Sequence, residues 1–352
     1  MNIDIIKVLG PSAFAFFIGI LITPILTNYL YKNRMWKKKA GKISPDGRET
    51  PIFNSLHKEK ETGTPRMGGI IIWVSALATV MIFWLLAEFW PTVGTAKMNF
   101  LSRNQTWLPL FTLLVGSIVG LIDDLMQVRE GIDPKKAGLP FFNRLLVVIA
   151  LGLAGGWWFY AKLGMVAITV PFGGSLFVGW LIIPLFILVM MALFSSGVID
   201  GLDGLAGGIM AIIFTAYTFI AYFQNQVDLA TFCAVITGGT LAFLWFNIPP
   251  ARFYMSETGI LGLTTALTVV AFLTDTVLIL PIIALPLLAT SLSVVIQLVS
   301  KKLRNGKKVF LVAPLHHHFE ALGWPSYKVV MRYWVISIIA AILGMIMALV
   351  SQ

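Results

Sequence analysis

Two aspartates, Asp200 and Asp203, interrupt the apolar stretch FSSGVIDGLDGLAGGIM, in which no Lys or Arg neutralises them. Their spacing of three residues puts both carboxylates on one face if the stretch is helical. The alternative is a tight turn in which an aspartate caps the following helix. Glycines on either side let another backbone or a ligand approach closely, so we interpret the pair as part of a functional site.

Four further stretches carry side chains or backbone amides that could take part in catalysis or binding: GLIDDLMQV, MSETGILG, PLHHHFEALGW and ETGTPRMGGI. Their titratable candidates are Asp123, Asp124, Glu257, His316, His317 and His318. Each stretch also has a plain interpretation: solvated acids at a helix end, an acid favoured by a helix dipole, a solvated loop, and a simple turn. In the fourth stretch, which precedes an apolar block, backbone amides facing an anion are the functional alternative.

The three consecutive histidines do not resemble core residues, and neither a helix nor a strand points all three in one direction. A three-His metal site from this run alone is therefore not expected. Phosphate binding or proton exchange fits the run better.

Long apolar blocks must position these groups. The chain has 352 residues, of which 58% are hydrophobic and 12% charged, and its blocks have the length of membrane-spanning helices. We predict one all-α polytopic membrane domain over 1–352, with the first block retained as a span. The single cysteine, Cys233, excludes an intramolecular disulfide and a thiolate metal site. Ten spans are expected, at about 11–31, 69–90, 107–125, 142–161, 175–194, 201–223, 229–246, 259–274, 276–299 and 331–350.

Basic residues alternate between the loops. The segments 32–68, 126–144, 247–258 and 300–332 contain ten, four, one and seven Lys or Arg residues, which together are 22 of the 26 in the chain. The positive-inside rule places these segments in the cytoplasm and both termini outside. All the candidate groups then fall at cytoplasmic span ends or in cytoplasmic loops, and we predict that they meet in one cleft.

The donor set favours a hard cation. Carboxylates without thiolates suit Mg²⁺, which binds through one or two carboxylates together with substrate phosphates. A phosphate-bearing cytoplasmic substrate follows, and the membrane location points to a lipid as the other substrate. The formal charge of +10 is attributed to membrane orientation and anionic headgroups, with no nucleic-acid partner expected.

Five motifs in order, GTPRMGG, GLIDDL, DGLDGLAGG, WFNIPPARFYMSETG and APLHHHFEALGWP, resemble those of the phospho-N-acetylmuramoyl-pentapeptide transferases. These belong to the polyprenyl-phosphate N-acetylhexosamine-1-phosphate transferases. The resemblance implies an Mg²⁺-dependent reaction of UDP-N-acetylmuramoyl-pentapeptide with undecaprenyl phosphate, giving lipid I and UMP in peptidoglycan synthesis. It also implies the bacterial cytoplasmic (inner) membrane, with membrane lipids as partners and a homodimer left open.

The resemblance carries roles to individual positions. Asp123 matches the carboxylate proposed to activate the lipid phosphate, with Asp124 beside it at the metal and phosphate cluster, and Glu257 falls at an Mg²⁺-ligating Asp. Asp200 is implied to be catalytic with these acids, as are the histidines His316, His317 and His318. The implied substrate-binding set is Lys60, Arg66, Arg144, Gly201, Leu202, Asp203, Asn247, Tyr254 and Gln297. In this set Gly201 and Leu202 line a uracil pocket, and Asp203, Asn247 and Tyr254 contact the nucleoside.

Several positions depart from the family pattern: Glu257 replaces Asp, Arg66 replaces Thr, Glu61 and Arg144 replace Lys, and Gly197 and Phe194 replace Asn. The exchange of Lys for Arg at Arg144 keeps the charge but changes the geometry. One interpretation is a compensated lineage in which Arg66 supplies the charge missing at Glu61. The other is an altered or weakened activity.

The ninth predicted span is long and contains Pro281 and Pro286. A bend there would open a lateral groove for a polyprenyl tail, whereas a tilted straight helix is the alternative. Three competing functions stay open at this point: a related transferase for another UDP-amino sugar, a cation-coupled transporter with acids near the midplane, and an inactive homologue.

Overall fold

Helices make up almost the whole of the computed structural model, which describes residues 2–38, 62–129 and 138–351. Among these residues, ten helical segments are long and apolar enough to cross a membrane, which confirms the predicted number. In chain order the helices are α1 (Asn2–Lys32), α3 (Ile70–Phe89), α4 (Val93–Met98), α5 (Trp107–Val128), α6 (Phe141–Ala161), α7 (Ile182–Ser195), α8 (Leu205–Phe223), α9 (Val227–Asn247), α10 (Ser256–Leu273), α11 (Leu280–Ile283), α12 (Leu285–Leu303), α13 (Leu315–Ala321) and α14 (Ser326–Val350).

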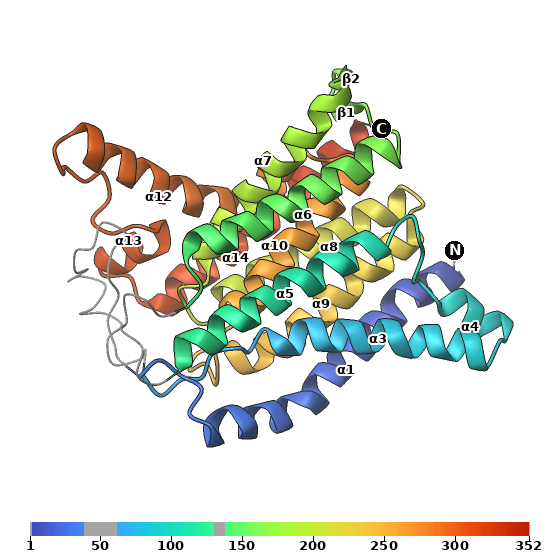
Figure 1. Cartoon of the computed structure of the whole chain (residues 1–352), viewed down its shortest axis with the longest axis horizontal. Coiled ribbons are helices and arrows are strands. Elements are labelled where there is room, and N and C mark those ends of the chain that lie inside the picture. Colours follow the sequence, from blue (N-terminus) through green and yellow to red (C-terminus); the bar gives the residue numbers. More distant parts are fainter. Residues whose placement is uncertain (1, 39–61, 130–137, 352) are drawn as a thin grey trace.

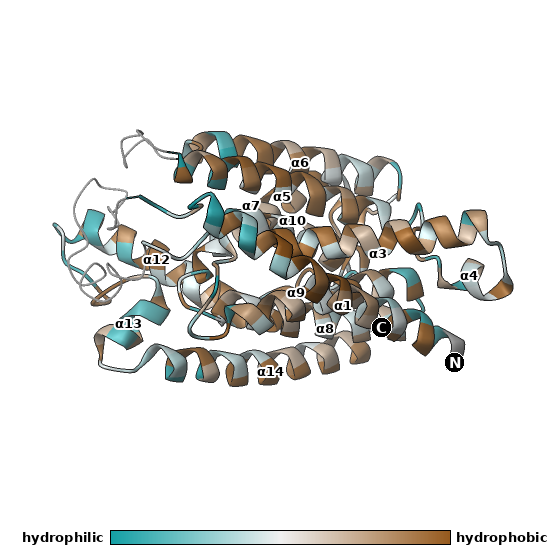
Figure 2. Ribbon diagram, turned by 90° about the horizontal axis from the view of Figure 1, so that it is seen from below, coloured by the Kyte–Doolittle hydropathy of each residue, from teal (hydrophilic) through white to brown (hydrophobic). Residues whose placement is uncertain are grey.

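The helices form a bundle around α8, α9 and α10, which are the most buried of the ten spans (Figure 1). The outer helices expose large apolar side chains, such as Leu21 on α1 and Ile339 on α14. Figure 2 shows brown, apolar ribbon along the spans and teal, polar ribbon gathered at the end that carries α13. The bundle therefore has an apolar girdle suited to lipid and one strongly polar end.

Both chain ends lie at the end of the bundle opposite to α13, together with α4 (Figure 1). At the same end is an antiparallel hairpin of β1 (Ala167–Val170) and β2 (Gly174–Phe177), which the sequence analysis did not predict. The even number of spans places the two termini on one side, as expected. Which side faces the cytoplasm stays a prediction.

Span boundaries differ from the predicted ones at two places that matter. The fifth span was expected from 175, but β2 and a short 3-10 helix (Gly179–Leu181) come first and α7 begins at Ile182. The sixth was expected from 201, but α8 begins at Leu205 because Gly204 adopts a positive φ of 78°. The turn that precedes α8 leaves its backbone groups available for contacts with other segments.

The ninth span is interrupted, as the two prolines in its sequence suggested. The helical backbone changes from α11 to α12 at Ala284, and each proline lies in the first turn of its helix, where its missing N–H costs least. Figure 1 shows α12 inclined away from the other spans toward the end that carries α13. The predicted bend is confirmed; the groove for a polyprenyl tail stays a prediction.

Candidate active site

The site begins where α5 packs against α10 through small residues. A Cβ built at Gly120 would overlap the carbonyl oxygen of Glu257, and one built at Gly116 would lie 2.9 Å from the Cα of Gly262. Two glycines four residues apart on α5 thus let the two backbones approach closely, as in membrane helix pairs of this type. The approach brings the last turns of α5 beside the first turn of α10, with their acidic residues together.

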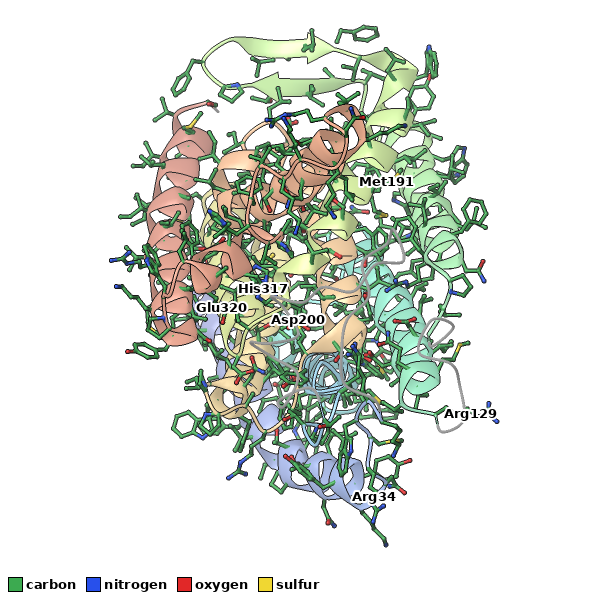
Figure 3. The ribbon with its side chains drawn as sticks, turned by 90° about the vertical axis from the view of Figure 1, so that its left-hand side faces the viewer. Arg34, Arg129, Met191, Asp200, His317 and Glu320 are labelled. Atoms are coloured by element: carbon green, nitrogen blue, oxygen red, sulfur yellow. The ribbon has the colours of Figure 1, made fainter. Side chains whose placement is uncertain are left out.

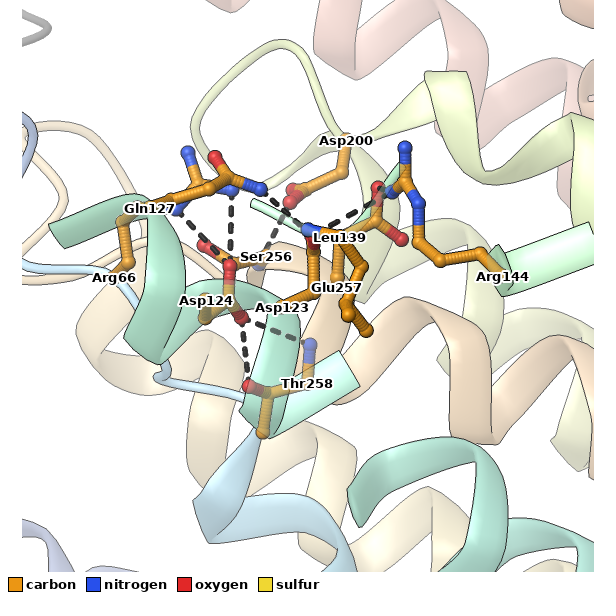
Figure 4. Close-up of polar contacts among 10 residues, drawn as sticks. All are labelled: Arg66, Asp123, Asp124, Gln127, Leu139, Arg144, Asp200, Ser256, Glu257 and Thr258. Carbon is orange, nitrogen blue, oxygen red and sulfur yellow. Dashed lines mark hydrogen bonds and ion pairs between the residues drawn. The ribbon is translucent and has the colours of Figure 1, made fainter. Parts of the chain in front are cut away.

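Asp124 on α5 is completely buried and receives hydrogen bonds from two segments (Figure 4). The backbone N–H and the hydroxyl of Thr258 donate to its Oδ2 at 3.0 and 2.6 Å. The guanidinium of Arg66 reaches its Oδ1, with Nε and Nη2 both at 3.1 Å. A buried carboxylate needs such partners, and here Arg66 supplies its counter-charge.

Asp123 is also buried, and both of its oxygens accept hydrogen bonds. The backbone N–H of Leu139 donates to Oδ1 at 2.6 Å and the Gln127 amide donates to Oδ2 at 2.6 Å. Arg144 Nη1 lies 3.5 Å from the same Oδ2 and 2.5 Å from Oε1 of Glu257. One cationic nitrogen on α6 therefore contacts carboxylates from α5 and α10 (Figure 4).

The segment before α3 is fixed against the segment before α10 by its backbone. Tyr254 N–H donates to the carbonyl of Pro65 at 2.9 Å, and the amides of Gly68 and Gly69 donate to the carbonyls of Tyr254 and Met255 at 2.8 and 3.1 Å. These two amides hold protein carbonyls, so the predicted anion-facing arrangement is wrong for them. Their pairing carries the preceding Arg66 into the carboxylate cluster.

Asp200 and Asp203 lie in a turn before α8, so the helical interpretation of their spacing is wrong. The Ser256 N–H donates to Asp200 Oδ2 at 2.8 Å, and the Ala251 N–H lies 3.3 Å from Asp203 Oδ2. Neither carboxylate caps α8, whose N-cap is Gly204. The turn places both acids against the segment that leads into α10, and Figure 4 shows Asp200 beside the other acids.

Asn247, at the end of α9, ties this turn to the same segment. Its Oδ1 accepts from the Gly204 N–H at 2.9 Å and its Nδ2 donates to the Phe253 carbonyl at 2.9 Å. The side chain is buried and both ends of its amide are engaged with backbone. Asn247 therefore positions the turn; a direct contact with a nucleoside stays a prediction.

Asp200 is partly buried, and its ionisation is perturbed. Desolvation raises the pKa of its carboxyl to about 6, although the hydrogen bond from Ser256 and the charge of Arg66 lower it. The charged form of Asp200 is therefore costly in the folded protein, which marks the position as a functional candidate.

The histidines lie on α13, against the Asp200 turn. His316 and His317 are buried and His318 is partly buried, so the run is no solvated loop. A Cβ on Gly201 would overlap Nε2 of His316 and lie 2.9 Å from Nε2 of His317. The absence of a side chain at Gly201 is what allows the two rings to face the turn. Figure 3 shows His317 and Glu320 near Asp200.

Glu320 orients one of these rings, and the sequence analysis missed it. Its Oε2 lies 2.7 Å from Nδ1 of His317, and its Oε1 accepts from the Ser326 hydroxyl at 2.7 Å. A carboxylate on Nδ1 fixes the proton there and leaves Nε2 toward Gly201. Glu320 lies three residues after His317, and this spacing on a helix was the sequence signal that could have revealed their contact. His318 differs, because its Nδ1 accepts from the Leu311 N–H at 3.2 Å.

Gln297 holds the loop that leads to α13. Its Oε1 accepts from the N–H groups of Val309 and Phe310, both at 3.0 Å, and its Nε2 donates to the Phe310 carbonyl at 2.8 Å. On the same helix, Ser300 donates to the Lys307 carbonyl of this loop, and Ser293 accepts from the Leu315 N–H at the start of α13. The structure therefore gives Gln297 a positioning role, whereas its predicted substrate contact is untested.

The predicted substrate-binding residues that remain are Leu202, Tyr254 and Lys60. Leu202 is buried in the turn before α8, and Tyr254 is partly buried beside Pro65. Lys60 and Glu61 lie outside the described residues, so the proposed compensation between Glu61 and Arg66 is not tested.

The donor set is compatible with Mg²⁺ completed by substrate phosphates. In the described parts of the chain, no group of three or more His, Cys, Asp or Glu side chains is arranged to hold a metal by itself. However, oxygens of Asp123 and Glu257 converge on one cationic nitrogen, so a cation fits between them. Fully ionised, the four acids and two arginines of Figure 4 carry a net charge of two negative, which one divalent ion neutralises.

The chain is similar to one protein family and to several named transferases. The model of glycosyl transferase family 4 matches residues 106–275. The transferase named phospho-N-acetylmuramoyl-pentapeptide-transferase of Geobacillus thermodenitrificans is 33% identical over 340 residues, covering 94% of this chain and 95% of its own. Proteins of the same name from Bacillus mycoides and Bacillus thuringiensis are 34% and 33% identical, with 94% of each chain covered.

The chain belongs to glycosyl transferase family 4. Its relatives of similar length carry the name that the sequence motifs suggested, so the predicted family is confirmed. The family match includes Asp123, Asp124, Asp200 and Glu257, whereas α13 lies beyond it. The histidine helix is therefore supported by the full-length relatives rather than by the family model.

The contact between Gly201 and α13 generates a prediction for this family member. Gly201→Ala is expected to lower transferase turnover at least about tenfold, because the new Cβ displaces His316 and His317. The melting temperature should change little, since the site lies at the end of the bundle. A matched control is Gly197→Ala in the same region, where a Cβ finds ordinary contacts at 3.5 Å from Ile260. Equal turnover in both variants would contradict the role of this contact.

The raised pKa of Asp200 generates a second prediction, with a definite sign. Wild-type stability should fall as the pH rises through the range from the ordinary Asp value of 3.8 to about 6, because only the unfolded chain ionises freely there. Asp200→Asn removes this cost and should stabilise the protein at pH 7.5 by roughly 3 kcal/mol at most. Melting temperatures at pH 7.5 and pH 5 check this: the advantage of the variant shrinks at pH 5. A variant that is less stable at pH 7.5 contradicts it.

Proposed function

We propose that this protein transfers phospho-N-acetylmuramoyl-pentapeptide from its UDP derivative to undecaprenyl phosphate, giving lipid I and UMP. The observation that carries the proposal is the joining of five motifs at one end of the bundle, in a chain that aligns with its relatives over 94% of its length. We place this end at the cytoplasmic face of a bacterial cytoplasmic membrane, where the basic loops favour it.

The reaction breaks the phosphoanhydride bond of the UDP-sugar and forms another with the lipid phosphate. The driving force is therefore small, and catalysis depends on alignment and charge neutralisation. The diphosphate belongs between Arg66 and Arg144, whose guanidinium groups suit phosphate oxygens. Asp200 and Asp203 lie in the turn before α8, where the nucleotide end of the substrate would be held.

Asp123 is proposed to orient the attacking lipid phosphate and to accept its proton where one is present. The hydrogen bonds from Leu139 and Gln127 fix both carboxylate oxygens, so the group is held in one orientation. When bound, Mg²⁺ would neutralise diphosphate oxygens and the departing UMP. Glu257, Asp123 and Asp124 are the residues proposed to hold it.

The Nε2 atoms of His316 and His317 face the Asp200 turn, so we assign them to the substrate phosphates or to the UMP that leaves. Glu320 keeps the Nδ1 proton of His317 in place, which leaves Nε2 to interact with the ligand. Gln297 supports this arrangement from α12 through the loop that precedes the histidines. The arrangement supplies hydrogen bonds to developing negative charge.

The experiment is radiolabel transfer in detergent or nanodiscs, with undecaprenyl phosphate and either UDP-N-acetylmuramoyl-pentapeptide or UDP-GlcNAc. Lipid-linked product and UMP are expected from the first donor only, and chelation of Mg²⁺ should abolish both. Asp123→Asn is expected to lower the rate at least about 10²-fold, the usual scale for loss of a group acting in proton transfer. The control Arg129→Gln, an exposed change at the end of α5, should keep normal activity.

Three other outcomes reject the proposal. Product from UDP-GlcNAc alone identifies a related transferase for another sugar. Ion-coupled flux without UMP identifies a transporter, although the acids lie at one end of the bundle rather than along its middle. Absence of UMP from both the wild type and Glu257→Asp, which restores the family carboxylate, identifies a homologue without transferase activity.

A further inference from the structure

Arg144 uses only part of its hydrogen-bonding capacity. It lies in the first turn of α6, and its Nη1 contacts Oε1 of Glu257 and lies 3.5 Å from Oδ2 of Asp123. Its Nε is buried and has no hydrogen-bond partner among the described residues. A guanidinium has five N–H donors, so a single engaged nitrogen leaves a planar fork available within the site.

The Nη1 atom lies near two carboxylates that are proposed to hold the metal. The two carboxylates that approach it come from different helices, α5 and α10, and both are proposed ligands of the cation. Arg66 differs, because both of its contacting nitrogens bond one oxygen of Asp124. Arg144 is thus the basic side chain that stands between the two proposed ligands.

We propose that Arg144 is an internal counter-ion that competes with the divalent cation for Glu257 and Asp123. Binding of the cation releases the guanidinium, which then turns its free donors to the diphosphate of the substrate. The inference rests on the proposed function for the identity of that diphosphate. The competition itself concerns only this chain and a metal ion.

Two physical arguments support the exchange. A divalent cation and a guanidinium near the same carboxylate oxygens repel each other, so binding of one weakens the contact of the other. A guanidinium also matches phosphate oxygens through two parallel hydrogen bonds, whereas a carboxylate contacted by Nη1 alone uses one. Substrate phosphate therefore offers Arg144 a better partner than the one it leaves.

The test measures Mn²⁺ binding to the full-length protein in nanodiscs by electron paramagnetic resonance, with no nucleotide or lipid substrate present. Arg144→Gln is expected to bind Mn²⁺ about tenfold more tightly than the wild type, within the range by which neighbours of metal ligands alter affinity. The affinity for UDP without metal should fall in the same variant.

Charge alone also predicts tighter cation binding, so the control removes the same charge nearby. Arg66→Gln deletes a guanidinium that contacts Asp124 in the same cluster, and its effect on Mn²⁺ affinity should be clearly smaller. Arg129→Gln, an exposed change just after α5, should leave the affinity unchanged. The proposal is overturned if Arg144→Gln binds Mn²⁺ no more tightly than Arg66→Gln, or more weakly than the wild type.

A second variant distinguishes the loss of the Arg144 charge from misfolding. Arg144→Met keeps a long side chain without the charge and should show the same gain, with the melting temperature of each variant confirming that it is folded. Failure of the proposed function leaves a separate signature. If the protein never forms lipid I but Arg144→Gln still binds Mn²⁺ more tightly than the wild type, the substrate assignment is refuted. The competition between Arg144 and the cation is then still supported.

Discussion

Close contact between α5 and α10 is the constraint on which the site depends. Glycines at 116, 120 and 262 remove the side chains that would separate these helices, and the hydrogen bonds from Thr258 to Asp124 then join their acidic ends. In a membrane such packing cannot rely on the hydrophobic effect, because lipid is as apolar as the helix surface. Van der Waals contact between backbones must supply the stability, and a single added Cβ removes it.

The carboxylates collected by this contact must be neutralised, since unpaired charge at the edge of a bilayer is costly. Arg66 and Arg144 do so from two other segments, and the sequence analysis interpreted both as departures from the family pattern. The compensated lineage stays a prediction. Glu257 reaches one methylene further than the family's Asp, and its oxygen meets the longer, forked Arg144. The described structure thus shows two of the substitutions in direct contact.

Much of this was accessible from the sequence. The ten spans followed from apolar blocks, and the gathering of acids and histidines followed from where those blocks end. The turn at Asp200 was one of two alternatives, because a spacing of three residues fits a helix and a turn equally, and only the positive φ of Gly204 decides. Glu320 was missed because the histidine run was interpreted as a loop, in which a spacing of three residues has no helical meaning. The pairing of Arg144 with Glu257 joins positions 113 residues apart, which no local pattern reveals.

Substitution of Gly120 tests the α5–α10 contact most directly. A Cβ at this position would overlap the backbone carbonyl of Glu257 on α10, so Gly120→Ala is expected to separate the two helices and to lower transferase activity at least about tenfold. The control Gly197→Ala, whose Cβ finds ordinary contacts at 3.5 Å from Ile260, should keep normal activity. Normal activity in Gly120→Ala, or an equal loss in both variants, would contradict the arrangement of helices that assembles the site.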